Sequence, residues 1–452
     1  MRLLRCALIA LLVCIIPDAL SAQSSDEGAK PQYPGHPPSQ AVEGTIGSAT
    51  VRVFGTVLLN TAVNDGAIFG QDVPLWSLAS TGTVTYPDGS TGTSGGNRDL
   101  IFTMRQSIFG VAVTQARTSG GWVASGLIEA DFFGTRPVDG TVPLNRVLDQ
   151  PRLRKAYGQL EHNSFKLVFG QDTALLAPID PISLSHVAMP LGATAGDLWA
   201  WLPQVRAEWK QTFGGTGLLL QGAILRPTFG DPRLETPPTA STSVDVSSSG
   251  LGERTTQPFW EGRLAAMPSI AGHKATLAVS GHVGKEKVGV DRDIKSLAVA
   301  FDGTVPVGPF VVFRGEAYKG SNLIPFQGGI DQGVALLAGA TATAPPLNIQ
   351  PIHDKGGWFE FTLLPMRNDK DAVYVGVGED KPQVGDLLPG STRTKNLFLW
   401  ASYFHKVTDA VTLAVEWSRW DFQTVTFVNN APGPLNPLAR VKVLNISLAY
   451  QF

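Results

Sequence analysis

The sequence predicts an all-β protein: a transmembrane, antiparallel up-and-down β-barrel of about sixteen strands. Three observations lead to this prediction. The chain begins with an export signal. Its later part consists of segments in which apolar and polar residues alternate, and the connections between these segments are alternately short and long.

The first 22 residues have the layout of a secretory signal peptide. Arg2 and Arg5 precede an unbroken apolar run over 7–16, and the small residues at 21 and 22 mark the expected cleavage site. The run is too short to cross a bilayer as a helix, which takes about 20 residues. We therefore expect export through the Sec pathway, followed by a Pro-rich, flexible periplasmic lead-in over 23–48.

The composition of the whole chain fits a β-structure, and no disulfide is expected after export. Its two cysteines, Cys6 and Cys14, leave with the signal peptide. The 49 glycines and 32 prolines favour strands and turns over long helices. A net charge of −2 with 16% charged residues gives no indication of nucleic-acid binding, and no later segment is long and apolar enough to span a membrane as a helix.

Period-two alternation divides the rest of the chain into an even number of expected strands, as single-chain bacterial barrels require. These segments are 49–64, 101–116, 121–134, 151–162, 165–177, 202–213, 216–228, 257–268, 273–285, 292–304, 309–320, 356–366, 371–381, 393–408, 410–424 and 437–452. They make up the expected barrel over 49–452.

The connections between these segments alternate in length. Tight turns are expected at 118–120, 163–164, 214–215, 305–308, 367–370 and 409, and long polar connections at 65–100, 135–150, 178–201, 229–256, 321–355, 382–392 and 425–436. The short connection at 286–291 breaks the trend. This alternation is typical of a barrel with periplasmic turns and extracellular loops, and a soluble β-sandwich has no reason to show it.

The last segment shows the pattern most sharply. Alternate residues from Leu444 onward are apolar up to Tyr450 and the terminal Phe452, while the residues between them are small or polar. A terminal aromatic residue on an apolar face resembles the signal by which the barrel assembly machinery recognises outer-membrane barrels. Tyr450 and Phe452 also suit the aromatic girdle that bounds the lipid-facing band.

Four segments occur in succession in the first half of the chain: MRQSIFGV from Met104, LIEADFFG from Leu127, PRLRKAYGQL from Pro151 and FKLVFGQD from Phe165. Together they resemble the DcaP-like family of trimeric porins, mainly over residues 100–225 and the terminal strand. The resemblance implies a sixteen-stranded homotrimer in the outer membrane of Gram-negative bacteria that passes small, often anionic, organic acids. DcaP itself carries an N-terminal coiled coil. Residues 23–44 of this chain show no heptad repeat, so a coiled coil is not expected there.

A porin selects solutes at a constriction set by side chains and an inward-folded loop. The connection 178–201 is the candidate for this loop, and it carries Asp180, His186 and Asp197. The resemblance implies that it folds into the lumen. A loop of this length could instead cover the mouth or a trimer interface.

Charged residues on the wet faces of the expected strands are the candidates for pore lining and solute contact. The arginines are Arg105, Arg152, Arg154, Arg206, Arg263 and Arg314, and the acids are Glu208, Glu261 and Glu316. Each acid lies two residues from an arginine on the same face, so local ion pairs are expected for Arg206, Arg263 and Arg314. Arg105, Arg152 and Arg154 have no such neighbour and are the stronger candidates for binding carboxylates.

Other functions find less support in the sequence. Catalytic and metal-ligand motifs are absent, so we expect no enzyme activity, metal or cofactor. An outer-membrane hydrolase would rest on Ser185 and His186, whose adjacency does not give a catalytic geometry. An anchor or adhesin acting through the loops 229–256 and 321–355 is the main alternative. The expected partners are outer-membrane lipid, two further copies of the chain, the assembly machinery, and small polar or anionic solutes.

Overall fold

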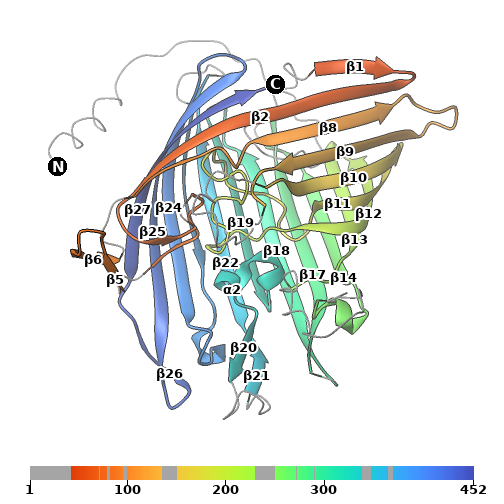
Figure 1. Cartoon of the computed structure of the whole chain (residues 1–452). Coiled ribbons are helices and arrows are strands. Elements are labelled where there is room, and N and C mark those ends of the chain that lie inside the picture. Colours follow the sequence, from red (N-terminus) through yellow and green to blue (C-terminus); the bar gives the residue numbers. More distant parts are fainter. Residues whose placement is uncertain are drawn as a thin grey trace, which may run out of the picture.

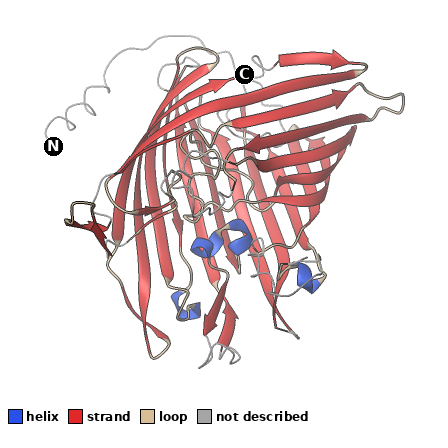
Figure 2. Cartoon of the chain, viewed as in Figure 1, coloured by secondary structure: helices blue, strands red, loops and turns tan. Residues whose placement is uncertain are grey.

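In a computed structural model, the protein is a closed, antiparallel β-barrel of sixteen strands, with almost no helix in the part of the chain that the structure describes (Figures 1 and 2). The structure describes residues 42–452 apart from 71, 79–81, 95–98, 135–149, 230–249, 271, 290, 338–347 and 365–369. The expected signal peptide and most of the expected lead-in lie outside the described residues. The predicted fold class is confirmed.

Each predicted strand overlaps a strand of the barrel wall. In chain order the wall consists of β2 (Ala49–Asn64), β7 (Asp99–Thr103) with β8 (Ile108–Gln115), β9 (Val123–Asp131), β10 (Arg152–His162), β11 (Phe165–Thr173), β12 (Trp201–Phe213), β13 (Thr216–Leu225), β14 (Phe259–Met267), β17 (Thr276–Gly289), β18 (Arg292–Pro306), β19 (Val311–Ser321), β22 (His353–Leu363), β23 (Asp371–Asp380), β24 (Arg393–Lys406), β25 (Val411–Val428) and β27 (Ala439–Gln451).

The first and last wall strands close the barrel. β2 pairs with β27 from Thr56 opposite Gln451 to Asn64 opposite Val443. The backbone of Phe452 adds one more pair of hydrogen bonds with Gly55, at N···O distances of 2.9 and 3.1 Å. Closure leaves no unpaired edge in the wall, which a strand in lipid could not tolerate.

Side chains alternate between the two faces of the wall as the sequence predicts. On β27, Leu444, Ile446, Leu448 and Tyr450 are 40–50% exposed on the outer face, whereas the residues between them are buried on the inner face. The outer face is therefore apolar and suited to lipid, and the inner face carries most of the charged residues.

One end of the barrel carries tight turns and the other carries long connections (Figure 1). The turn between β12 and β13 consists of Gly214 and Gly215, whose φ angles of 54° and 84° suit a type I′ hairpin that only small residues adopt without strain. Part of the expected turn 367–370 lies outside the described residues. By the general rule for such barrels, the long connections mark the extracellular end.

The long connections contain the remaining elements. These are β3 (Ile68–Phe69), β4 (Trp76–Ser77), β5 (Gly82–Thr85), β6 (Thr91–Ser94), η1 (Glu253–Thr255), η2 (Ile324–Phe326), α2 (Gly328–Asp331), β20 (Val334–Leu337), β21 (Asn348–Pro351) and η3 (Val384–Asp386), while β15 (Ser269–Ile270) and β16 (His273–Lys274) form a hairpin at the turn end. No helix among the described residues is long and apolar enough to cross a membrane.

Three expectations about the elements are wrong. The segment 101–116 is not one strand, because a turn separates β7 from β8. The connection 425–436 is largely a hairpin, in which β25 runs on and pairs with β26 (Ala431–Leu435). The end of the expected flexible lead-in forms β1 (Val42–Ile46), which pairs with the start of β2 beyond the point where β27 ends.

Candidate functional site

The segment between β11 and β12, residues 174–200, occupies the interior of the barrel (Figure 1). We call it the inner loop. All of its residues are buried or half-buried. Its leucines and alanines belong to the same buried clusters as apolar side chains of the wall: Leu191 shares one cluster with Trp420, and Leu184 shares another with Phe404. Few charged residues and many small apolar ones make this burial possible.

Acidic side chains of the wall accept hydrogen bonds from backbone N–H groups of the inner loop. Glu261 accepts hydrogen bonds from the N–H groups of Leu175 and Leu176 at 2.6 and 3.2 Å, and Glu316 accepts one from Leu198 at 3.0 Å. A buried segment without regular structure needs such partners, because an unpaired backbone N–H away from water costs about 1–3 kcal/mol. The acids therefore hold the loop in place.

This role overturns two of the three expected local ion pairs. Arg206 does pair with Glu208, at 2.7 Å. Arg263 instead pairs with Asp302 at 2.6 Å, and Arg314 pairs with Glu360 at 3.4 Å. The reason is geometric: Asp302 and Glu360 lie on other strands that face the guanidinium groups, while Glu261 and Glu316 are engaged by the inner loop.

Arg152 and Arg154 lie side by side on β10, and both contact the inner loop. Arg154 binds Glu129 at 2.7 Å and Asp131 at 3.0 Å, and Arg152 binds Asp131 at 2.5 Å. Arg154 also donates to the carbonyl of Val187 at 2.9 Å. Neither arginine has an acid two residues away on its own strand, and β9 supplies the acidic partners across the strand pair. Arg154 is completely buried, which removes it from direct solute contact in this structure.

A β-bulge adds a cation that the sequence pattern did not reveal. The register of β10 against β9 shifts between Leu153 and Lys155. As a result, the consecutive residues Arg154 and Lys155 are both buried on the inner face, and Lys155 binds Asp172 at 3.5 Å. Strict alternation would have directed Lys155 to lipid.

Arg105 lies in the turn between β7 and β8 and not on a strand. Its guanidinium binds Asp72 at 3.2 Å and stacks 3.7 Å above the ring of Phe133. The same turn presents Gln106, whose side-chain oxygen accepts the N–H groups of Val187 and Ala188 at 2.8 and 3.0 Å. The interruption of the strand therefore serves to hold the tip of the inner loop.

His186 belongs to a buried polar cluster at this tip. The hydroxyl of Ser185 contacts His186 Nδ1 at 2.7 Å and also binds Glu416 of β25, while His186 Nε2 lies 3.2 Å from the carbonyl of Pro74. Ser185 and His186 are only 2% and 4% exposed. The Ser185 hydroxyl is therefore not accessible to a substrate. The cluster anchors the tip of the inner loop to the wall.

The two acids of the inner loop are held at its ends. The backbone carbonyl of Asp180 accepts a hydrogen bond from Arg314 at 2.8 Å, and the carboxylate of Asp197 accepts one from the indole of Trp358 at 3.0 Å. Burial raises the pKa of Asp180 to about 6, against the opposing effect of nearby cations such as Lys155. Burial, and then the charges of Asp180 and Glu316, raise the pKa of Asp197 well above its usual value.

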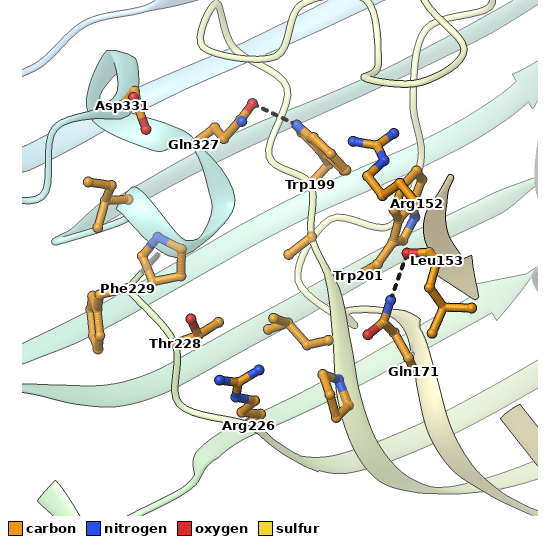
Figure 3. Close-up of a pocket in the computed structure, with 15 residues that line it drawn as sticks. Arg152, Leu153, Gln171, Trp199, Trp201, Arg226, Thr228, Phe229, Gln327 and Asp331 are labelled. Atoms are coloured by element: carbon orange, nitrogen blue, oxygen red, sulfur yellow. Dashed lines mark hydrogen bonds between the residues drawn. The ribbon is translucent and has the colours of Figure 1, made fainter. Parts of the chain in front are cut away.

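A cavity of about 520 Å³ opens beside the inner loop on the extracellular side (Figure 3). Trp199, Trp201 and Phe229 form apolar parts of its lining, and Arg152 and Arg226 supply positive charge. Trp199 is fixed by a 2.8 Å hydrogen bond from its indole to Gln327. The Arg152 guanidinium lies 5.2 Å from the centre of the Trp201 ring, within the range of a cation–π contact.

In two ion pairs of this wall, the cation is more exposed than the acid. The side chain of Arg152 is 26% exposed but its partner Asp131 is fully buried, and Lys166 is 23% exposed against 5% for its partner Glu208. The cation therefore faces the lumen while the acid lies behind it. Among the described residues, no group of three or more His, Cys, Asp or Glu side chains could hold a metal ion.

Sequence reasoning missed several residues that build this site, namely Gln106, Lys155, Lys166, Glu360 and Glu416. Lys155 was hidden by the bulge. Gln106 and Glu416 act through loop contacts that no local pattern reveals. Trp199 and Trp201 lie at the end of the connection 178–201, which the sequence had already singled out as the candidate constriction loop.

No protein-family model and no curated protein matches the sequence. Solved structures do match, and they define the class of fold: that of an outer-membrane channel. The DcaP channel of Acinetobacter baumannii matches with a TM-score of 0.61 and 16% identity, over 90% of this chain and 99% of that one. The fold implied by the sequence resemblance is thereby confirmed.

Two further solved structures share the fold. OmpT of Vibrio cholerae matches with a TM-score of 0.52 and 12% identity, over 91% of this chain and 100% of that one. An anion-selective porin from Comamonas acidovorans matches with a TM-score of 0.51 and 12% identity, over 89% of this chain and 100% of that one. At these identities the similarity concerns the fold.

Proposed function

We propose that this protein is an outer-membrane porin that lets small hydrophilic solutes cross without energy input, with a preference for organic anions. The proposal includes the homotrimeric state that the sequence resemblance implies. Its passive mechanism follows from a closed barrel with a polar inner face and a fixed inner loop that narrows the lumen.

The exposure of the Arg152 side chain above a buried Asp131 carries the anion preference. A solute entering from the extracellular side meets a guanidinium whose fork of N–H donors matches a carboxylate. The rings of Trp199 and Trp201 line the same cavity and provide contact for the apolar part of an organic acid. The fold shared with an anion-selective porin supports the same direction of selectivity.

The inner loop supports a constriction that does not move during passage. Side chains from several parts of the barrel bind it: Gln106 from the turn between β7 and β8, and Glu261, Glu316 and Glu416 from wall strands. A loop held in this way sets the size limit for solutes, and the charged side chains beside it set the sign of the preferred charge.

Planar-bilayer recording in a salt gradient tests the proposal. The purified protein should conduct, and its reversal potential should favour anions. Replacing Arg152→Gln removes a partly exposed cation and should lower the anion-to-cation permeability ratio by up to about fivefold, the equivalent of about 1 kcal/mol or less. The matched control is Lys406→Gln, an exposed lysine at the turn end, which should leave the ratio unchanged.

Each failure has a distinct meaning. Absence of conductance would refute the porin assignment and favour the anchor or adhesin alternative. Conductance with a preference for cations would refute the anion preference alone. An unchanged ratio in Arg152→Gln would show that the cavity beside Trp201 does not lie on the conducting path.

A further inference from the structure

The outer surface of the barrel carries a row of cations near its extracellular end. We call this row the basic collar. It runs from β17 to β27 and consists of Lys285, Lys295, Lys319, Lys355, Lys381, Lys395, Arg419, Arg440 and Lys442.

Each strand of the collar places its cation at the border of the apolar band. A residue two positions along the strand from a collar cation lies on the same face, and on several strands it is apolar. Examples are Val283 beside Lys285, Trp417 beside Arg419 and Leu444 beside Lys442. These apolar residues are 40–51% exposed on the outer face of the barrel. Period-two alternation therefore directs the collar side chains outward, toward the lipid boundary and away from the lumen.

The strand register brings the collar cations next to one another. Lys285 lies directly opposite Lys295, and Lys319 lies directly opposite Lys355. Lys381 continues this row, because its N–H bonds to the carbonyl of Lys355 at 3.0 Å. Like charges directly opposite each other on paired strands are destabilising, so this arrangement gains from an external anion.

The same juxtaposition recurs on the last two wall strands. Arg419 lies opposite Lys442, and Arg440 lies opposite Asp421. Arg419 and Arg440 both bind the Asp421 carboxylate, the latter at 2.7 Å. One carboxylate is thus shared by two guanidinium groups, and their remaining N–H groups can bind further acceptors.

Few acids balance the collar. Besides Asp421, Glu379 lies on the outer face with its carboxylate 4.0 Å from Lys395. At the two ends of the row, Asp293 is 3.9 Å from Lys287, and Asp65 accepts the backbone N–H of Lys442. The collar therefore carries a clear excess of positive charge.

The collar covers only part of the circumference. At the extracellular ends of β9 to β13, the corresponding outward residues are apolar: Phe132, Leu153, Phe169, Val205 and Ile224, all 40–50% exposed. The two arcs of the barrel thus face different surroundings. The apolar arc fits contact with apolar protein surface, and the basic arc fits an anionic boundary.

We propose that the basic collar binds the phosphate groups of anionic lipids in the outer leaflet and so marks the lipid-facing arc of the barrel. The proposal rests on the outer-membrane location given under the proposed function. Lysine side chains extend from the edge of the apolar band to the headgroup level, and arginine forms paired hydrogen bonds with phosphate oxygens. The excess of charge and its one-sided distribution favour lipid over a compact soluble ligand.

The test uses the full-length mature protein in detergent and two probes with identical acyl chains: phosphorylated lipid A and lipid A treated with phosphatase. The collar variant carries Lys319→Gln, Lys355→Gln and Lys442→Gln. The matched control carries Lys274→Gln, Lys370→Gln and Lys406→Gln, three exposed lysines at the turn end. Heat-modifiable migration on gels reports whether each variant is folded.

We expect the native protein and the control to bind phosphorylated lipid A at least about tenfold more tightly than the dephosphorylated form, since each cation near an anionic surface contributes roughly fivefold. The collar variant should lose at least about tenfold in affinity for the phosphorylated form. Equal binding by collar variant and control would overturn the proposal, as would equal binding of the two lipids. Displacement of the lipid by an equal concentration of inorganic phosphate would also overturn it.

Two further measurements keep the result interpretable. If the triple collar variant does not fold, the single variants Lys319→Gln and Lys355→Gln replace it. Each should also bind phosphorylated lipid A more weakly than the native protein. Conductance of the same samples separates the two proposals. A protein that binds lipid through the collar without conducting would refute only the proposed function, and a conducting protein without collar-dependent binding would refute only the collar.

Discussion

Replacing Arg154→Met should destabilise the barrel more than any other single loss of charge at the β9–β10 wall. The side chain of Arg154 is fully buried, and its guanidinium joins two wall acids, Glu129 and Asp131, to the carbonyl of Val187 in the inner loop. Methionine has a similar length but carries neither charge nor donors. The substitution therefore leaves buried acceptors without their partner.

The structure sets the size of the effect. Removing one partner of a buried ion pair costs about 3–5 kcal/mol, because the remaining charge stays buried. Asp131 retains Arg152, so the lower end, about 3 kcal/mol, applies here. The control Arg152→Met removes a guanidinium that is 26% exposed, and Asp131 retains Arg154, so about 1 kcal/mol or less is expected.

Urea unfolding of the detergent-folded protein, followed by tryptophan fluorescence, gives both values from midpoint and slope. The two substitutions share Asp131, so the double variant should cost more than the sum of the single ones. The reasoning would be refuted if Arg154→Met cost no more than Arg152→Met. A double variant that was strictly additive would refute the shared role of Asp131.

Three further predictions concern the inner loop and closure. Burial raises the pKa of Asp180 to about 6, so protonation favours the seated inner loop. This contribution is fully present below the ordinary pKa of 3.8 and is lost as the pH rises through about 6, so current noise should grow from about pH 4 to about pH 6. Asp180→Asn should abolish that change. Gly196 has φ +111°, and an added Cβ would lie 2.3 Å from the carbonyl oxygen of Gly357. Gly196→Ala should thus cost about 2 kcal/mol or more in urea unfolding, and an unchanged midpoint would contradict the observed contact. Phe452→Ala should reduce the amount of folded, heat-modifiable barrel in membranes more than the outward-facing control Leu448→Ala, and equal yields would exclude a special role for the terminal residue.

Much of the wall could be predicted because strand alternation is a local property. A period of two fixes which residues share a face, and the outward apolar row ending in Tyr450 is visible without any knowledge of neighbouring strands. Loop length is equally local, so the two ends of the barrel and the long connection 178–201 were visible as well. The pair of Arg206 and Glu208 was also predictable, because both residues lie on one strand.

The ion-pair partners could not be predicted in the same way. Arg263 and Arg314 each have an acid two residues away, yet they bind Asp302 and Glu360. Glu360 lies directly opposite Arg314 on the paired strand, where Cβ atoms are about 4.5–5.5 Å apart. Asp302 lies on β18, which is separated from Arg263 on β14 by the intervening strand β17. Partner choice therefore depends on the register between strands and on the inner loop, which engages Glu261 and Glu316.

By itself, the sequence determined the class of barrel, its two faces and its two ends, because each of these follows from spacing along one strand. Only the tertiary structure decided that a bulge turns Lys155 inward, that a broken strand presents Gln106 to the inner loop, and that cations spaced far apart in the chain align as one collar. These features depend on how strands are placed against each other, and the hydrogen-bond register that sets this placement joins residues that are distant in sequence.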